Sequence, residues 1–224
     1  MPEKTSAVKA LTRESLAKAV KQLSEQDPLL AELVATYGTP PLWQRTQSFA
    51  TLVHIILEQK VSLASALAVM RRVNKLCPCM QPAAFLQIKQ APLKAAGISE
   101  RKVSYCYSIA EAIVTGQLNL ARLRRCDNES VMAQLSAIRG IGPWTAGVYL
   151  LMAMRRPDAW ASGDRALVVS YAESLSMQQA AGQPPCEVPS YAVLDEVAER
   201  WQPYRAAAAR ILWHAYLSRR GKMQ

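Results

Sequence analysis

The sequence predicts an all-α protein, and three observations support this fold class. Apolar residues recur three and four positions apart along most of the chain, which is the period of a helix with one buried face. Glycine, proline and N-capping residues separate these segments where helices begin and end. No alternating run of polar and apolar residues is long enough to indicate a β-strand, and the sequence contains no internal repeat.

The first half of the chain contains clear helix boundaries. Asp27 and Pro28 form an N-cap followed by proline at the first helical position, and Gly38 ends that helix. Ser62 and Ser99 are further N-caps. The expected helices cover residues 12–26, 28–37, an apolar core segment around 49–57, 63–76, two short segments beginning at Pro82 and Pro92, and 100–115.

The second half continues in the same way. We expect a basic turn at 120–125, a helical hairpin, a helix from 165 to about 176, a loop over 178–189, a helix from the Ser190 cap to near Trp201, and a last helix from Pro203 that ends before Gly221. Because half of the residues are hydrophobic and no tract is strongly biased, the chain should be globular along its length.

Residues 135–149 indicate a helix, a tight turn and a second helix. Gly140 and Gly142 supply the backbone freedom that a sharp reversal needs, and Pro143 suits the first turn of the second helix. The first N–H groups of that helix have no partner within it, and the helix dipole adds positive potential there. This turn is therefore expected to bind an anion, and a DNA phosphate is the obvious candidate.

Composition favours the same kind of partner. The formal net charge is +10 and the isoelectric point is about 9.6, which suit an anionic macromolecule. No signal peptide precedes the first helix, and no apolar run approaches the ~18 residues of a membrane span. We expect an intracellular protein, cytoplasmic in a bacterium or nuclear in a eukaryote, without a membrane partner.

The cysteines and histidines do not indicate a metal site. The chain has five cysteines, an odd number that favours reduced thiols in an intracellular protein. Cys77 and Cys79 are the only close pair, and no second pair or histidine cluster completes a zinc site. His54 and His214 are interpreted as helix-packing or surface residues.

The segment Gly140-Ile-Gly-Pro-Trp-Thr-Ala146, followed by Gly163-Asp164, resembles the helix-hairpin-helix (HhH-GPD) DNA glycosylases. Within this superfamily it is most similar to the 3-methyladenine DNA glycosylase II branch. The pattern around 199–205 and Trp213 extends the resemblance to about residues 46–217. The resemblance implies one domain over 1–224, in which two helical subdomains flank a DNA- and base-binding cleft. The helix-hairpin-helix would cover about 129–154, and the N- and C-terminal helices would share a subdomain.

The resemblance implies that Asp164 is the catalytic residue. Cleavage of an N-glycosidic bond builds positive charge on the sugar, and a nearby carboxylate can stabilise that charge and orient the attacking water. The alternative is that Asp164 serves only as an N-cap. Asp158, which follows Pro157, is interpreted as a loop residue.

Trp144 and Trp213 match aromatic positions of the family's base pocket. Electron-rich rings can bind cationic alkylated purines by stacking and cation–π attraction, although either tryptophan could instead belong to the core. Val148 stands where relatives can carry a tyrosine, so lesion preference can differ. Bifunctional members have a lysine nucleophile at the position of Trp144, and its absence implies a monofunctional enzyme.

The resemblance also implies DNA contacts. They are assigned to the hairpin residues Gly140, Ile141, Gly142 and Thr145, and to Gln59, Lys60 and Lys102. In the family, the residue at the position of Lys60 fills the gap left by the flipped nucleotide, and it is often apolar. Lys60 could fill the gap with its aliphatic stem, or be a solvated surface lysine. Hairpin carbonyls in the family can hold a monovalent cation; no other cofactor and no structural metal or iron–sulfur cluster is expected.

The resulting hypothesis is a monomeric, monofunctional glycosylase that flips and removes alkylated purines, such as 3-methyladenine and 7-methylguanine, from damaged double-stranded DNA. It would leave an abasic site. The alternative is a helix-hairpin-helix module that binds DNA without catalysis. A helix-turn-helix transcription factor is disfavoured, because residues 144–154 are too apolar for a recognition helix. Which lesion is preferred is left open.

Overall fold

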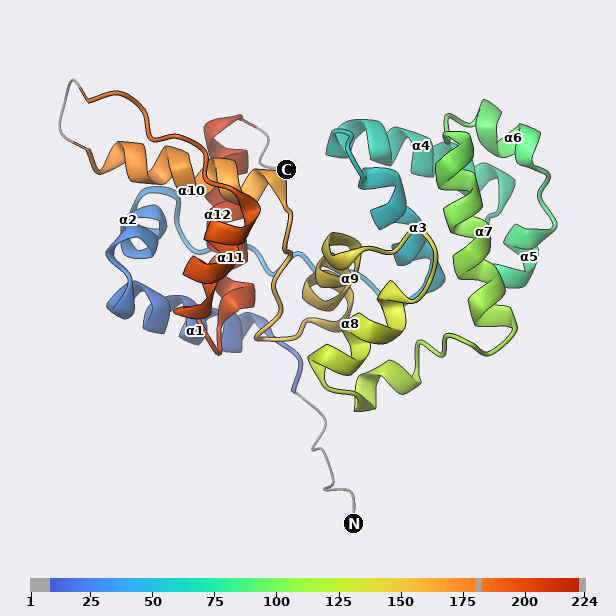
Figure 1. Cartoon of the computed structure of the whole chain (residues 1–224), viewed down its shortest axis with the longest axis horizontal. Coiled ribbons are helices and arrows are strands. Elements are labelled where there is room, and N and C mark those ends of the chain that lie inside the picture. The colour runs from blue at the N-terminus through green and yellow to red at the C-terminus, as the bar shows by residue number, and fades with distance from the viewer. Residues whose placement is uncertain (1–8, 180–182, 222–224) are drawn as a thin grey trace, which may run out of the picture. The chain divides into compact units, whose positions relative to one another are not determined.

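The computed structural model of the chain describes residues 9–179 and 183–221. Its described part contains helices and no strand, which confirms the predicted all-α class (Figure 1). The helices are α1 (Arg13–Gln26), α2 (Pro28–Tyr37), α3 (Phe49–Glu58), α4 (Leu63–Leu76), α5 (Pro82–Leu86), α6 (Gln90–Ala95), α7 (Glu100–Val114), η1 (Arg122–Arg125), α8 (Asn128–Ser136), α9 (Pro143–Tyr149), η2 (Leu150–Met154), α10 (Arg165–Met177), α11 (Tyr191–Glu199) and α12 (Arg205–Arg219). Among these, none combines the length and apolarity that crossing a membrane requires.

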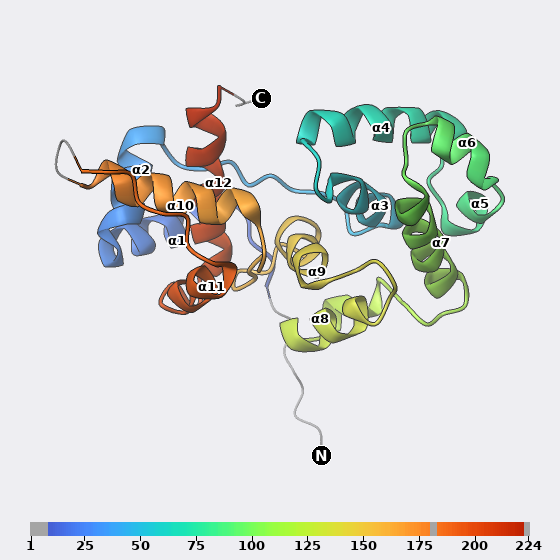
Figure 2. The same ribbon diagram turned by 45° about the horizontal axis from the view of Figure 1, so that its top comes forward.

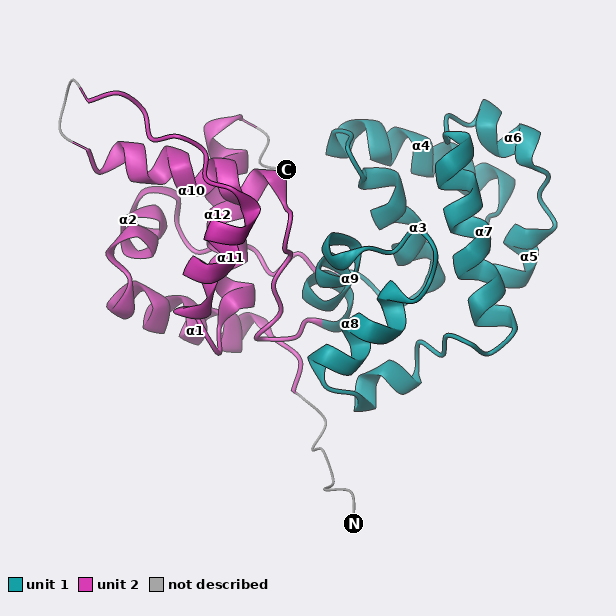
Figure 3. Cartoon of the chain, viewed as in Figure 1, with its two compact units in different colours: residues 1–8, 45–154 teal, residues 9–44, 155–224 magenta. Residues whose placement is uncertain are grey.

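The chain forms two compact units, which Figure 3 shows in different colours. The described residues of unit 1 are 45–154, which include α3 to α9 and η2. Unit 2 combines 9–44 with the described residues from 155 onward, so α1 and α2 share a unit with α10, α11 and α12. The chain therefore leaves unit 2 after α2 and returns to it after the helical hairpin.

Unit 1 is built around α3. Nearly every side chain of this helix is buried, and Leu52, Val53, Ile55 and Ile56 are fully inaccessible. The helix packs against α4, α7 and α9, which surround it (Figures 1 and 2). Burial of this apolar segment stabilises the unit, because each such side chain contributes about 1.5–3 kcal/mol on leaving water.

Unit 2 is built around α12. Its first turns are Ala206–Ala209, and these small residues let α12 pack closely against α1, α2 and α10. Arg210 is buried in the same helix, where it donates hydrogen bonds to the carbonyls of Leu42 and Ala206, both at 2.9 Å. Burial lowers the pKa of Arg210 to about 10. The bond to Leu42 attaches the segment before α3 to the centre of unit 2.

Helix boundaries differ from the expected ones at several positions. α6 begins at Gln90 rather than Pro92, so the proline lies within its first turn, where a missing N–H costs nothing. α12 begins at Arg205, because the chain first makes a turn in which Tyr204 N–H donates to the Trp201 carbonyl at 2.7 Å. The expected continuous helix after Pro143 is α9 followed by the π-helical turn η2.

Candidate functional site

The hairpin between α8 and α9 turns sharply at Gly140. This residue has φ +96°, and an added Cβ would lie 2.2 Å from Cγ of Tyr105. Ile141 N–H donates to the carbonyl of Ile138 at 3.0 Å and closes the turn. Both the backbone conformation and the contact with α7 therefore require glycine at position 140.

Gly142 differs from the expectation. Its φ of −97° is accessible to any residue, so the prediction that this glycine supplies special backbone freedom is wrong. An added Cβ would meet nothing within 4 Å. Neither the backbone conformation nor packing therefore requires glycine here, at the N-cap of α9.

Gln59 joins the end of α3 to the hairpin. Its Nε2 donates to the carbonyl of Gly140 and to Oγ1 of Thr145, both at 3.0 Å. Thr145 is buried, with 1 % of its surface exposed. The structure thus brings three predicted DNA-contact residues together, and the contacts of Gln59 and Thr145 hold the hairpin in place.

Lys102 lies beneath the same corner. Its Nζ donates to the carbonyls of Leu57 and Gln59, both at 2.8 Å, and so caps the C-terminal end of α3. Burial lowers the pKa of Lys102. The DNA contact predicted for Lys102 stays a prediction, and the structure adds an internal role.

Lys60 is exposed at the corner between α3 and α4, with φ +58°. Next to it, Val61 and Leu63 expose 47 % and 56 % of their surfaces. Left-handed backbone is uncommon for a residue with a Cβ and is found in strained functional turns. The corner thus presents one cation and two apolar side chains to solvent, directly after the residue that binds the hairpin.

Trp144 follows Pro143 in the first turn of α9 and is half-buried. Val148, one turn further along, is buried with 4 % exposed. The helix thus begins with an exposed proline and a half-buried indole, and Val148 belongs to the core.

Asp164 is the N-cap of α10 in unit 2. Its Oδ1 accepts a hydrogen bond from the backbone N–H of Leu167 at 3.0 Å and from the indole Nε1 of Trp213 at 3.2 Å. Both side chains are mostly buried, with 9 % of Asp164 and 8 % of Trp213 exposed. The structure therefore brings these two predicted site residues into contact, and the capping role weighed for Asp164 is real. Gly163, with φ +81°, makes the turn before it.

Two carboxylates that the sequence interpretation did not assign to the site hold the segment before Asp164. Asp158 forms a bidentate ion pair with Arg205, with both N···O distances 2.9 Å. Asp195, on α11, accepts hydrogen bonds from Trp160 and Ser162. Asp158 lies in a loop, as interpreted, but is also a structural anchor. No local pattern indicated either partnership.

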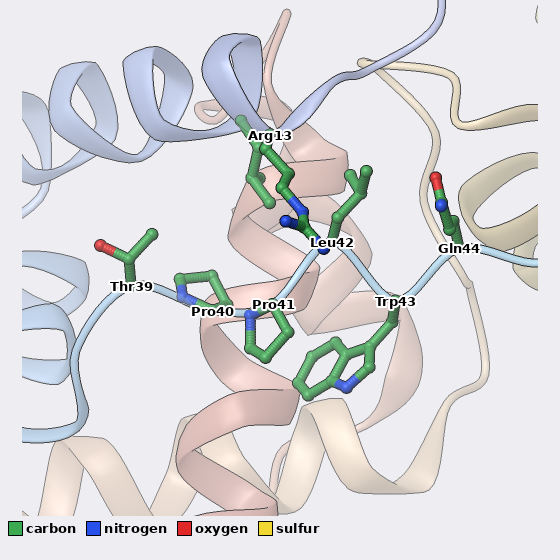
Figure 4. A pocket seen from close by; sticks show the side chains of 8 residues that line it. Arg13, Thr39, Pro40, Pro41, Leu42, Trp43 and Gln44 are labelled. Atoms are coloured by element: carbon green, nitrogen blue, oxygen red, sulfur yellow. The ribbon is translucent and has the colours of Figure 1, made fainter.

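A separate pocket of about 530 Å³ lies in unit 2 (Figure 4). It is lined by Arg13 of α1, Leu16 and the segment 39–44. Trp43 in this lining has φ +39°, and its ring meets His214 edge-on at 6.1 Å between centroids. None of the predicted site residues lines this pocket, and it contains no carboxylate.

Within the described residues, no three His, Cys, Asp or Glu side chains gather where they could hold a metal ion. At the hairpin, the carbonyl of Ile138 accepts from Ile141 N–H and that of Gly140 from Gln59. A carbonyl oxygen has two lone pairs, so each keeps acceptor capacity. The residues present therefore fit a monovalent cation.

An all-α chain with a glycine turn, a braced helical hairpin and a helix-capping aspartate beyond it has the architecture of a helix-hairpin-helix DNA repair protein. Residues 53–205 match the model of the HhH-GPD superfamily of base excision DNA repair proteins. Because the match covers most of the chain, the protein belongs to this superfamily.

Curated and solved relatives agree with the family. The chain is 25 % identical over 215 residues to DNA-3-methyladenine glycosylase 1 of Schizosaccharomyces pombe, covering 94 % of this chain and 90 % of the relative. The structure of the 3-methyladenine DNA glycosylase of that yeast in complex with abasic DNA matches with a TM-score of 0.79 and 25 % identity, over 88 % of this chain and 95 % of that one. A DNA-3-methyladenine glycosidase from Bacillus halodurans matches with a TM-score of 0.70 and 26 % identity, over 91 % of each chain.

Proposed function

We propose that this protein is a monofunctional DNA glycosylase that removes alkylated purines of the 3-methyladenine and 7-methylguanine type and leaves an abasic site. The observation that carries the proposal is the Asp164 carboxylate, buried at the N-terminus of α10 and bonded to Trp213. Family membership and similarity to proteins named 3-methyladenine DNA glycosylases support the same reaction. The substrate is damaged duplex DNA, and the protein acts as a monomer.

Asp164 stabilises the reacting sugar in this mechanism. As the glycosidic bond breaks, the sugar acquires oxocarbenium character, and the carboxylate offsets that charge while it orients a water toward C1′. The Leu167 N–H and the Trp213 indole N–H fix the carboxylate before the substrate arrives. Such preorganisation is effective because no reorientation is needed as the charge develops.

Recognition rests on charge and stacking. N-alkylated purines are cationic, and the partly exposed Trp144 offers a π face to such a base. Trp213 combines the proposed base contact with its bond to Asp164. Trp144 cannot act as an amine nucleophile, so no covalent sugar–enzyme step is expected and the strand stays intact.

The hairpin holds the backbone on one side of the lesion through main-chain groups, which give register without reading sequence. The corner of Lys60, Val61 and Leu63 fills the gap left by the flipped nucleotide. Its two exposed apolar side chains suit an unstacked base step, and Lys60 supplies a cation for a phosphate. In this proposal, Val61 and Leu63 supply the apolar contact, so a lysine can occupy the position that is often apolar in the family.

A monovalent cation at the hairpin carbonyls is part of this proposal. It would add positive charge beside the phosphate, held by oxygens such as those of Ile138 and Gly140. Replacing K⁺ by tetramethylammonium at constant ionic strength should weaken binding to abasic duplex DNA several-fold. Equal affinity in the two salts would remove the cation from the account.

A non-catalytic DNA-binding module is the alternative. It would need only the hairpin and the corner, and Asp164 would then be a helix cap bonded to an indole, as Asp27 is to Trp201. Similarity to proteins named DNA-3-methyladenine glycosylases favours the enzyme.

The test is a single-turnover base-release assay on duplexes that carry methylated purines, with the freed base identified by mass. Asp164→Asn keeps a side chain of the same shape but removes the charge. We expect it to lower the rate constant by about 10²–10⁴-fold, the contribution typical of a positioned catalytic group. Its dissociation constant for abasic DNA should stay within a few-fold of that of the wild type. Unchanged release by Asp164→Asn would exclude this residue as the catalytic one.

A further inference from the structure

The segment that delivers Asp164 to the start of α10 is a tight turn. Residues 160–163 precede the aspartate, and Asp164 N–H donates back to the Ala161 carbonyl at 3.2 Å. Gly163 completes the reversal with φ +81°. The direction in which the carboxylate leaves the backbone is therefore set by this turn as well as by the helix that follows.

Asp195, on α11, holds this turn with both oxygens. Oδ1 accepts the indole N–H of Trp160 at 2.7 Å, and Oδ2 accepts the hydroxyl of Ser162. The two donors lie on alternate residues and flank the buried Ala161. A single carboxylate thus fixes the turn at two points, only two residues before Asp164.

Trp160 is also held by a contact with a second tryptophan. Its ring packs against that of Trp201 at 5.7 Å between centroids, and Trp201 is 1 % exposed. Trp201 in turn donates from Nε1 to Oδ2 of Asp27 at 2.7 Å. Trp160 is therefore fixed between a hydrogen-bond acceptor on α11 and a ring in the core of unit 2.

We propose that Asp195 is a positioning residue for Asp164: by holding Trp160 and Ser162 it fixes the turn that aims the catalytic carboxylate. This inference rests on the proposed catalytic role of Asp164. Asp195 touches neither substrate nor reacting atoms. It acts through the turn, so its removal lets the carboxylate adopt orientations that do not match the charge developing on the sugar.

The contacts of Asp164 indicate that Asp195 orients the carboxylate rather than stabilising the fold. The Leu167 N–H and the Trp213 indole hold Asp164 directly, and neither bond involves Asp195. The side chain of Asp195 is only half-buried. Loss of Asp195 should therefore disturb orientation more than folding.

The test compares Asp195→Ala, Asp195→Asn and, as a matched control, Glu196→Ala, which removes the exposed carboxylate of the next residue on α11. In single-turnover assays on methylated duplex DNA, Asp195→Ala should lower the rate constant about tenfold, with abasic-DNA affinity within twofold of the wild type. Asp195→Asn should restore most of the rate, since its Oδ1 accepts from Trp160 and its amide donates to the Ser162 hydroxyl. Ser162→Ala, a milder change, should give an intermediate rate.

A second measurement does not depend on activity. The five tryptophan indole N–H groups give separate NMR signals, and that of Trp213 reports its bond to Asp164. Asp195→Ala should shift the Trp213 signal, whereas Glu196→Ala should leave it unchanged.

The outcomes separate the two proposals. Base release by the wild type with an unchanged rate in Asp195→Ala, or a rate equally low in Asp195→Asn, would overturn the positioning role. So would a Trp213 signal that stays in place in Asp195→Ala. If the wild type released no base while the Trp213 signal moved as expected, the proposed function would fail and the link between Asp195 and Asp164 would stand.

Discussion

Gly140 and Gly142 lie two residues apart in the hairpin, but the protein's own packing restricts only Gly140. Any other residue at position 140 would have to adopt the left-handed backbone conformation, and its Cβ would clash with Tyr105 on α7. At position 142 the backbone is extended and the space beside it is open. Packing and backbone conformation therefore require glycine at position 140 but not at position 142.

Substituting each glycine by alanine tests this distinction. Gly140→Ala should destabilise the protein by about 2 kcal/mol or more, since left-handed backbone alone costs about 1–2 kcal/mol and the clash adds to it. In Gly142→Ala, the weaker N-cap is offset by the lower entropy of the unfolded chain, so thermal stability should hardly change. Its affinity for abasic DNA should nevertheless fall at least tenfold. Wild-type DNA affinity in Gly142→Ala would refute a close phosphate approach at this residue.

At the scale of helices, the two lysines around the α3–α4 corner have different surroundings. Lys60 is exposed, whereas the ammonium of Lys102 ties α7 to the last carbonyls of α3. For duplex DNA, each phosphate contact adds about 0.9 to the slope of log affinity against log salt. Salt dependence therefore distinguishes a phosphate contact from an internal link between helices.

We expect Lys60→Ala to lower that slope by about 0.9 without a change in thermal stability. Lys102→Met should lower the melting temperature, because the two carbonyls at the end of α3 lose a charged donor, which is typically worth about 1.5–3 kcal/mol. Its salt slope tests the predicted DNA contact of Lys102. A reduced slope would show that this ammonium also contacts a phosphate, and an unchanged slope would limit Lys102 to its internal role.

Helix ends with a local signal could be predicted from the sequence. Asp27, Ser62, Ser99 and Ser190 all cap the helices expected of them. The pairing of Asp195 with Trp160 and Ser162 could not, since these residues lie 35 and 33 positions apart. A helical period shows which face of a helix is buried but not which helix covers it. Asp164 and Trp213 were found through a motif, and their contact needed the structure.

Across the whole molecule, the two histidines make stability depend on pH. His54 lies in unit 1 and His214 in unit 2, and burial is the main cause that lowers the pKa of each from its ordinary value of 6.5. Glu58 opposes this effect at His54, and a bond to the backbone of Gly38 opposes it at His214. Because the unfolded chain binds protons more readily, both units lose stability as pH falls.

The contribution is fully present above pH 6.5, the ordinary histidine value, and is lost as pH falls through the lower values of the folded protein. Melting temperatures measured from pH 7.5 to 5 should therefore decrease, and His54→Gln and His214→Gln should each reduce that decrease. Since the two residues lie in separate units and share no partner, the double variant should show the sum of the two effects. A double variant with the pH dependence of the wild type would show that other groups control stability in this range.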